Sequence, residues 1–447
     1  MTSSLAALHA REEARFLDLH PRSRALASRA ENLFQGVPMH WMRKWPGGFP
    51  IFAREAKGAR FVDVDGIEYV DFCLGDTGAM AGHAPEPTLR ALTEQAARGI
   101  TLMLPSEDAL EVSKELTRRF GVSSWQFALT ATDANRFSIR LARHLTGRPK
   151  VLVFNWCYHG TVDETLATLE NGVVGPRSGN LGPPVNPAET TRVVEFNDVD
   201  AVERELSFGD AAVVLTEPAL TNVGMVFPEP VFHDALRELT RRHGTLLAID
   251  ETHTICCGPG GYTTEHGLEP DIVTIGKPIA GGIPAAAYGF SQEVAARLAR
   301  TIGLEDVDVG GIGGTLAANA LSLAAMRATL AEVLTEDAFA RTIPLAERWT
   351  EGVAAGIEQA GLPWHVSRLG CRAEYLFRPD RPRNGSEANA AGDSALERYM
   401  HLFALNRGIL LTPFHNMALM SPATTEADVD RHTEVFREAV LELKAAQ

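Results

Sequence analysis

The sequence predicts an α/β protein built on a mostly parallel sheet, and two observations carry that prediction. Apolar runs of strand length recur between about residues 85 and 330, at 150–154, 211–215, 245–249 and 272–275. Runs that are apolar on both faces are typical of a parallel sheet covered on both sides. Amphipathic stretches such as 231–243 separate some of these runs, and alternation of strand and helix indicates an α/β domain.

The N-terminal part of the chain, residues 1–84, has a different pattern. Residues 5–34 are charged and amphipathic, with alanine and leucine, and predict a helix. Two short strand-like runs, 61–64 and 69–72, flank Asp65 and Gly66. An Asp-Gly pair between two such runs predicts a β-hairpin.

The C-terminal part, residues 331–447, predicts a smaller α+β domain. Its pattern indicates one helix over 338–360, short strands near 374–377 and 408–411, and a last helix over about 426–446. We therefore expect a large domain over 85–330 and a small domain over 331–447 that the N-terminal segment joins.

Composition narrows the class of protein. The chain has 447 residues and a formal net charge of -15, which argues against nucleic acid or an anionic membrane as the main partner. Five cysteines form an odd count without a CxxC pair, which indicates reduced thiols. No apolar run approaches the ~20 residues of a membrane span, and the N-terminal residues lack a signal-peptide core. We expect a cytoplasmic protein.

Two ionisable residues stand at the ends of predicted buried strands. Asp250 ends the run 245–249, and Lys277 follows the run 272–275. Ligands of open α/β sheets bind beyond the carboxyl ends of the strands. A lysine that forms a Schiff base and an acid that keeps a pyridine nitrogen protonated are what pyridoxal phosphate chemistry needs. A surface lysine and a capping aspartate are the plainer interpretation of each residue taken alone.

A phosphate group would need its own binding turn, and the sequence offers two. Residues 129–135, which include Thr130, Ala131 and Thr132, precede a helical run and would present free amides to an anion. A helix cap without a ligand fits that stretch equally well. The second turn is the glycine-rich segment 310–315. After the first strand, Tyr158 could lie against a cofactor ring or belong to the core. The histidines are too scattered to predict a metal site.

Taken together, these residues resemble the class III aminotransferases, a group of fold-type-I pyridoxal phosphate enzymes. The resemblance runs from about residue 35 almost to the C-terminus, and the nearest branch holds glutamate-1-semialdehyde aminomutase and β-phenylalanine aminotransferase. The segments that carry it, in order, are Asp63–Gly66, Tyr69–Phe72, Gly82-His83, Tyr158–Gly160, Glu217-Pro218, Asp250-Glu251, Gly276-Lys277 and Gly314-Thr315. It implies a seven-stranded, mostly parallel sheet in the large domain.

The resemblance also implies roles for individual residues. Lys277 would be the Schiff-base lysine and proton carrier, Asp250 would pair with the pyridine nitrogen, and Glu217 would position the surrounding network. The remaining cofactor contacts would come from Thr130, Ala131, Thr132, Tyr158, His159 and Thr252. Thr315 would reach the phosphate of a second subunit's cofactor, which implies a homodimer.

The chain departs from the family pattern at several of these places. Ala131 stands where the family usually has glycine, and Thr252, followed by His253, stands where an apolar residue usually packs under the ring. The two segments expected to line the substrate pocket contain Met39, Trp41, Arg43, Phe414 and His415. Arg43 is the one candidate in them for binding a substrate carboxylate, and the other side chains favour an apolar, aromatic-tolerant pocket.

These features predict an aminotransferase that moves an amino group between an amine or aromatic β-amino acid and a carbonyl acceptor by a ping-pong mechanism. An isomerase of the glutamate-1-semialdehyde aminomutase type is the alternative, because it would use the same residues. A non-catalytic binding protein that kept the fold is a more remote one.

Overall fold

The computed structural model describes residues 3–303 and 309–446. The chain forms two compact units. The first unit comprises Met1–Pro85, Ala340–Arg381 and Ala391–Gln447, and the second comprises Glu86–Phe339 and Pro382–Ala390. Within the described part, no helix combines the length and the apolarity that crossing a membrane requires.

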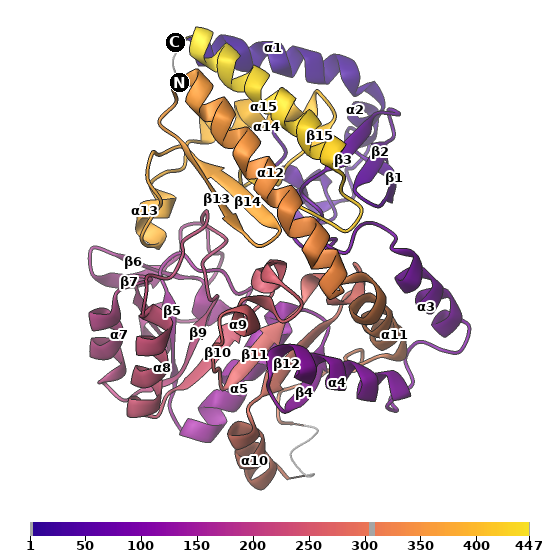
Figure 1. The fold of residues 1–447 in the computed structure, drawn as a ribbon. Coiled ribbons are helices and arrows are strands. Elements are labelled where there is room, and N and C mark those ends of the chain that lie inside the picture. The colour runs from indigo at the N-terminus through magenta and orange to yellow at the C-terminus, as the bar shows by residue number, and fades with distance from the viewer. Residues whose placement is uncertain (1–2, 304–308, 447) are drawn as a thin grey trace. The chain divides into compact units, whose positions relative to one another are not determined.

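A seven-stranded sheet forms the centre of the second unit (Figure 1). All neighbouring strands are parallel except β12, which runs antiparallel to both of its neighbours. The mostly parallel sheet expected from the sequence is therefore confirmed. In spatial order the strands are β4 (Ser124–Ala128), β12 (Ala286–Phe290), β11 (Ile272–Ile275), β10 (Leu246–Asp250), β9 (Ala211–Thr216), β5 (Lys150–Phe154) and β8 (Thr191–Val194).

The central strands are apolar because helices cover them. Every residue of β9, β10 and β11 is buried. Helix α5 (Ala131–Thr146) packs against several strands of the sheet, and α8 (Phe232–His243) packs against β10 and beside α7 (Val199–Leu206). Each fully buried Val, Leu or Ile side chain contributes about 1.5–3 kcal/mol, so the sheet interior is the main stabilising core of this unit.

Shorter elements complete the second unit. Helix α11 (Ala320–Ala328) packs against α3 (Glu86–Ala96) and α4 (Glu107–Phe120), and a π-helical turn, Thr329–Val333, continues it. The other elements are β6 (Ala167–Glu170), β7 (Val173–Pro176), α6 (Pro187–Thr190), α9 (Gly261–Glu265), α10 (Gln292–Thr301) and α13 (Gly385–Asn389).

The first unit begins with two helices, where the sequence had predicted one. Helix α1 (Ser3–Leu19) ends before Pro21, and α2 (Pro21–Ala27) starts there. The single helix over 5–34 was wrong because proline has no N–H to donate and restricts the residue before it. His20, at this break, has non-helical dihedrals, and its ring contacts the Phe16 carbonyl and the Tyr69 hydroxyl.

The remaining strands of the first unit form two small sheets. The predicted hairpin is present as β2 (Arg60–Asp63) and β3 (Glu68–Asp71), and Asp65 in its turn accepts hydrogen bonds from the amides of Arg22 and Ser23. These strands lie between β1 (Ala53–Lys57) and β15 (Ile409–Leu410), the latter parallel to β3. The second sheet and the helices of this unit are β13 (His365–Leu369), β14 (Arg372–Leu376), β16 (Met417–Leu419), α12 (Glu336–Ala360, which starts in the second unit), α14 (Ser394–Leu405) and α15 (Glu426–Ala445).

Candidate active site

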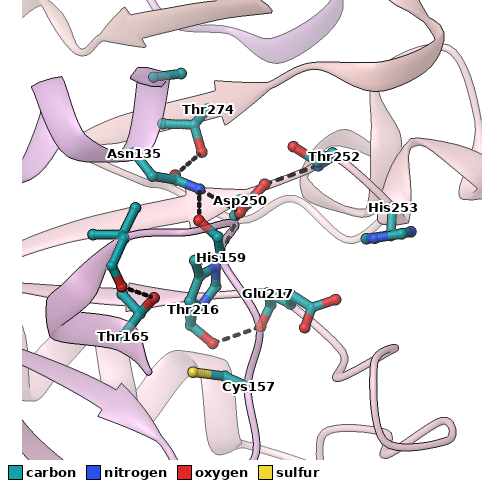
Figure 2. A network of polar contacts seen from close by, with 12 residues as sticks. Asn135, Cys157, His159, Thr165, Thr216, Glu217, Asp250, Thr252, His253 and Thr274 are labelled. Carbon is teal, nitrogen blue, oxygen red and sulfur yellow. Dashed lines mark hydrogen bonds and ion pairs between the residues drawn. The ribbon is translucent and has the colours of Figure 1, made fainter. Parts of the chain in front are cut away.

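Asp250 is the centre of a buried polar network at the carboxyl edge of the sheet (Figure 2). Its Oδ2 accepts hydrogen bonds from Asn135 Nδ2 at 2.8 Å and is 2.9 Å from His159 Nδ1, and its Oδ1 accepts one from the Thr252 amide at 3.0 Å. Thr274 donates to Asn135 Oδ1 at 2.6 Å, which fixes the orientation of that amide group. Three neighbouring segments therefore hold one carboxylate in a single orientation.

This network keeps Asp250 ionised. Burial opposes the charge, but the hydrogen bonds from His159, Thr252 and Asn135 outweigh it and hold the pKa of the carboxyl below its usual range. Burial also opposes a charge on His159, yet Cys157 and Asp250 outweigh it and raise the pKa of the imidazole. An ionised carboxylate fixed at the end of a buried strand fits a protonated pyridine nitrogen.

The N-terminus of α5 provides a compact turn that fits a phosphate group. Thr130 caps the helix, with Oγ1 accepting from the Asp133 amide at 3.1 Å, so the amides that follow lie at the positive end of the helix dipole. Ala131 is the first helical residue and has no positive φ, so the alanine in place of glycine is compatible with this backbone.

Glycines let two other segments approach this turn closely. A Cβ atom on Gly160 would lie 2.1 Å from Thr132 Oγ1, and one on Gly276 would lie 3.0 Å from the Ala131 Cβ. Real Cβ atoms essentially never come as close as the first of these. The turn, the loop after β5 and the residue before Lys277 thus meet at one place, and the donor set there suits an anion.

Lys277 follows β11 directly and is half-buried. Its φ of 50° lies in the left-handed region, which is uncommon outside glycine and often occurs at functional sites. Its Nζ lies 2.7 Å from Nε2 of His253. His253 is a buried side chain on the segment that follows β10, and it is labelled in Figure 2. The lysine and Asp250 thus stand on adjacent parallel strands, since β10 pairs with β11.

The other site residues predicted in this unit differ in their burial and in the strands that they follow. Tyr158 is half-buried in the loop after β5, and His159 is buried beside Asp250. Glu217 follows β9, is buried, and accepts a hydrogen bond from the Thr221 hydroxyl. Thr315 is exposed in the segment before α11.

The five residues expected to line a substrate pocket lie in the first unit. The Trp41 and Phe414 rings meet edge to face with centroids 5.8 Å apart, and the Met39 sulfur accepts a hydrogen bond from the Trp41 amide. Arg43 is exposed at the end of the 3-10 helix His40–Arg43. His415 is buried, with Nδ1 3.5 Å from the Glu374 carboxylate. Three apolar side chains therefore gather, while His415 faces an acidic partner.

The structure adds two residues that the sequence alone had not placed at the site. Asn135 was part of the predicted phosphate turn, but nothing in the sequence ties it to Asp250, 115 residues away. His253 follows Thr252, which stands where the family usually has an apolar residue, and that change of polarity was the available signal. The described residues include no group of three or more metal-ligating side chains suited to a metal ion.

Comparison with known proteins places the chain among enzymes. The family model "Aminotransferase class-III" matches residues 42–440. The curated glutamate-1-semialdehyde 2,1-aminomutase 2 of Brevibacillus brevis is 34% identical over 88% of this chain and 92% of its own length.

Solved structures give the same result. A glutamate-1-semialdehyde aminomutase from Pseudomonas aeruginosa PAO1 is 53% identical, covers 99% of both chains and has a TM-score of 0.97; a second structure from that source is a complex with PMP. A β-phenylalanine aminotransferase from Variovorax paradoxus is 26% identical, with a TM-score of 0.86 and 97% coverage of both chains.

Proposed function

The chain belongs to the class III aminotransferase family, and from that premise we propose that it is an isomerase of the glutamate-1-semialdehyde aminomutase type. The observation that carries the proposal is 53% identity, over 99% of both chains, to a structure with that name. An enzyme so named moves an amino group from carbon 2 to carbon 1 of one molecule. This proposal favours the alternative predicted from the sequence over the main prediction, transfer between an amine or aromatic β-amino acid and a keto acid or ketone acceptor.

The family and the relatives indicate pyridoxal phosphate as the cofactor. When bound, it supplies an aldehyde that links covalently to amines and a ring that takes up the electron pair of a broken C–H bond. We propose that Asp250, held ionised by its three donors, pairs with the ring nitrogen, and that the turn Thr130–Thr132 binds the phosphate.

In this proposal Lys277 moves the proton. Its Nζ takes a proton from one carbon of the substrate and returns it to another position, and the same amine holds the cofactor between turnovers. Tyr158 limits the position of the ring from the loop after β5. Glu217 and His159 are positioning residues, since His159 contacts Asp250 directly.

We further propose that the enzyme works as a homodimer. Four side chains around residues 102–110 are strongly exposed for apolar residues: Leu102 at 49%, Met103 at 77%, Leu104 at 72% and Leu110 at 70%. Exposed apolar groups in one stretch favour a protein interface. The Ile100 carbonyl accepts from the Ala320 amide at 2.9 Å, so this stretch lies beside the segment that contains Thr315.

The experiment is to mix the purified, cofactor-loaded enzyme with glutamate 1-semialdehyde and no second substrate. We expect its isomer, 5-amino-4-oxopentanoate, to form in an amount equal to the substrate consumed, with no release of ammonia. The Lys277→Ala variant is the matched control and should give none. Absence of isomer from the wild-type enzyme, with the cofactor bound, would overturn the proposal.

An aminotransferase is the second candidate, and the apolar cluster of Met39, Trp41 and Phe414 favours it. A pocket lined by an aromatic ring and two apolar side chains suits an apolar substrate better than it suits glutamate 1-semialdehyde, which is small and polar. The β-phenylalanine aminotransferase of similar fold supports the same candidate. Release of a ketone or aldehyde from an amine or β-phenylalanine, with amination of the cofactor seen by absorbance, would favour it over the isomerase.

A further inference from the structure

We propose that His253 is a catalytic residue that accepts a hydrogen bond from Lys277 Nζ and stabilises the ammonium form of this lysine during proton transfer. This inference rests on the proposed function of Lys277 as the proton carrier. The observation behind it is the 2.7 Å contact between Lys277 Nζ and His253 Nε2.

The chemistry of the contact limits how protons are distributed. An ammonium has only donors, and an imidazolium has only donors, so two protonated groups cannot share this short contact. One partner must offer a lone pair. In the proposed step the lysine is the donor, and the neutral imidazole Nε2 offers the lone pair. His253 is 5% exposed, so its imidazole makes this contact away from bulk solvent.

The position of His253 is set by its neighbours rather than by chance packing. Glu251, fully buried, accepts from the Thr254 hydroxyl at 2.6 Å and from the Thr263 amide at 2.5 Å. The Glu251 amide donates to the Thr274 carbonyl on β11 at 2.8 Å. The segment that contains His253 is therefore tied on one side to α9 and on the other to the strand that leads to Lys277.

The proposed step balances without any further reagent. The C–H bond of the substrate breaks, the electron pair stays on the carbon side, and the proton bonds to Nζ. His253 accepts an N–H hydrogen bond from the resulting ammonium and is not itself protonated. The proton then leaves Nζ for its new carbon, and the lysine returns to the neutral amine.

The first test uses the cofactor-free enzyme, so that it does not depend on any substrate. Trinitrobenzenesulfonate arylates neutral amines, and peptide mapping at pH 8 gives the rate at Lys277. The His253→Phe variant keeps a ring but has no acceptor. We expect its Lys277 to react on the order of 10-fold faster, because the ammonium loses a charge-assisted hydrogen bond.

Two controls separate this role from general disturbance. His253→Gln keeps an acceptor oxygen and should react at close to the wild-type rate. His266→Phe changes an exposed histidine at the end of α9 and should do the same. A His253→Phe rate within twofold of wild type, or a His253→Gln rate equal to that of His253→Phe, would overturn the proposal.

The second test uses the loaded enzyme. With a donor deuterated at the reacting carbon, the isotope effect on the half-reaction should increase in His253→Phe and return to the wild-type value in His253→Gln. An isotope effect unchanged in His253→Phe would count against the proposal. If wild-type Lys277 did not attach the cofactor at all, the proposed function would fail instead, and the arylation rates would still report on His253.

Discussion

Two regions with assigned candidate residues differ sharply in how they are held. Asp250 is 3% exposed and has donors from three separate segments. Trp41 and Met39, by contrast, are 37% and 44% exposed, and Trp41 meets Phe414 through one ring contact. Substituting a side chain that several buried hydrogen bonds fix costs much of the free energy of unfolding. Substituting an exposed apolar side chain costs little. This difference is consistent with our proposal that the chemical step depends on the Asp250 network and substrate choice on the cluster around Trp41.

The largest expected effect is at Lys277. Lys277→Ala removes both the proposed attachment point and the proposed proton carrier, so we expect turnover to fall by at least about 10⁴-fold. Turnover and the absorbance of the bound cofactor measure it. Lys114→Ala, at an exposed position of α4, is the matched control. Residual turnover within a hundredfold of wild type would contradict the role of Lys277.

Asp250→Asn tests the charge at the centre of the network. We expect kcat to fall by about 10²–10⁴-fold and the enzyme to lose roughly 1–3 kcal/mol of stability. The amide nitrogen of asparagine would face a donor whichever way it turned, because both carboxylate oxygens of Asp250 accept hydrogen bonds.

Asp271→Asn is the control for that variant. Asp271 precedes β11 at the opposite edge of the sheet and pairs with Arg237 at 2.7 Å. Its loss should reduce the melting temperature while leaving kcat within a fewfold of wild type. Equal effects of the two variants on kcat would show that Asp250 acts only through stability.

Gly160→Ala tests the close approach at the proposed phosphate-binding turn. The added Cβ would meet Thr132 at 2.1 Å, at a φ of +81°. We expect a stability loss of about 1–3 kcal/mol and weaker cofactor binding, measured by fluorescence titration. Gly172→Ala has nearly the same φ, +79°, with nothing near its Cβ, so it isolates the backbone cost. Similar cofactor affinities in both variants would refute the steric explanation.

The pair of His159 and Asp250 should make stability depend on pH. The pKa of His159 is raised in the folded protein, to about 10. Its contribution is therefore fully present below the unfolded value of about 6.5 and is lost as pH rises toward 10. We expect the difference in unfolding free energy between wild type and His159→Gln to shrink by roughly 4 kcal/mol across this range. Urea unfolding at pH 6.5, 8 and 10 measures it; a constant difference would contradict the charged pair.

The smallest effect is expected in the exposed region. Trp41→Ala should raise KM about tenfold for an apolar or aromatic donor, because one partly exposed ring contact is lost. The substitution leaves Asp250 and Lys277 in place, so kcat should change little. The control is Trp125→Phe, which changes a tryptophan of β4 in the second unit. A thousandfold loss of kcat in Trp41→Ala would move this residue into the chemical step.

Much of the fold followed from the sequence because the predicted strands are buried along all or nearly all of their length. Strands β5, β9, β10 and β11 were predicted from apolar runs and are present. Strands β4, β8 and β12 were not predicted. β4 alternates between exposed and partly buried residues, β8 contains Thr191 and Arg192, and β12 contains alanines and a glycine, so none gives a strong apolar run.

The sequence by itself determined the strand ends that carry Asp250 and Lys277, because hydrophobic periodicity reports burial along one segment. Only the tertiary structure decided which side chains meet there. Asn135 and His159 reach Asp250 from 115 and 91 residues away, and His253 reaches Lys277 from 24 residues away. Such contacts depend on the order in which parallel strands are arranged in the sheet, and local sequence patterns carry no record of that order.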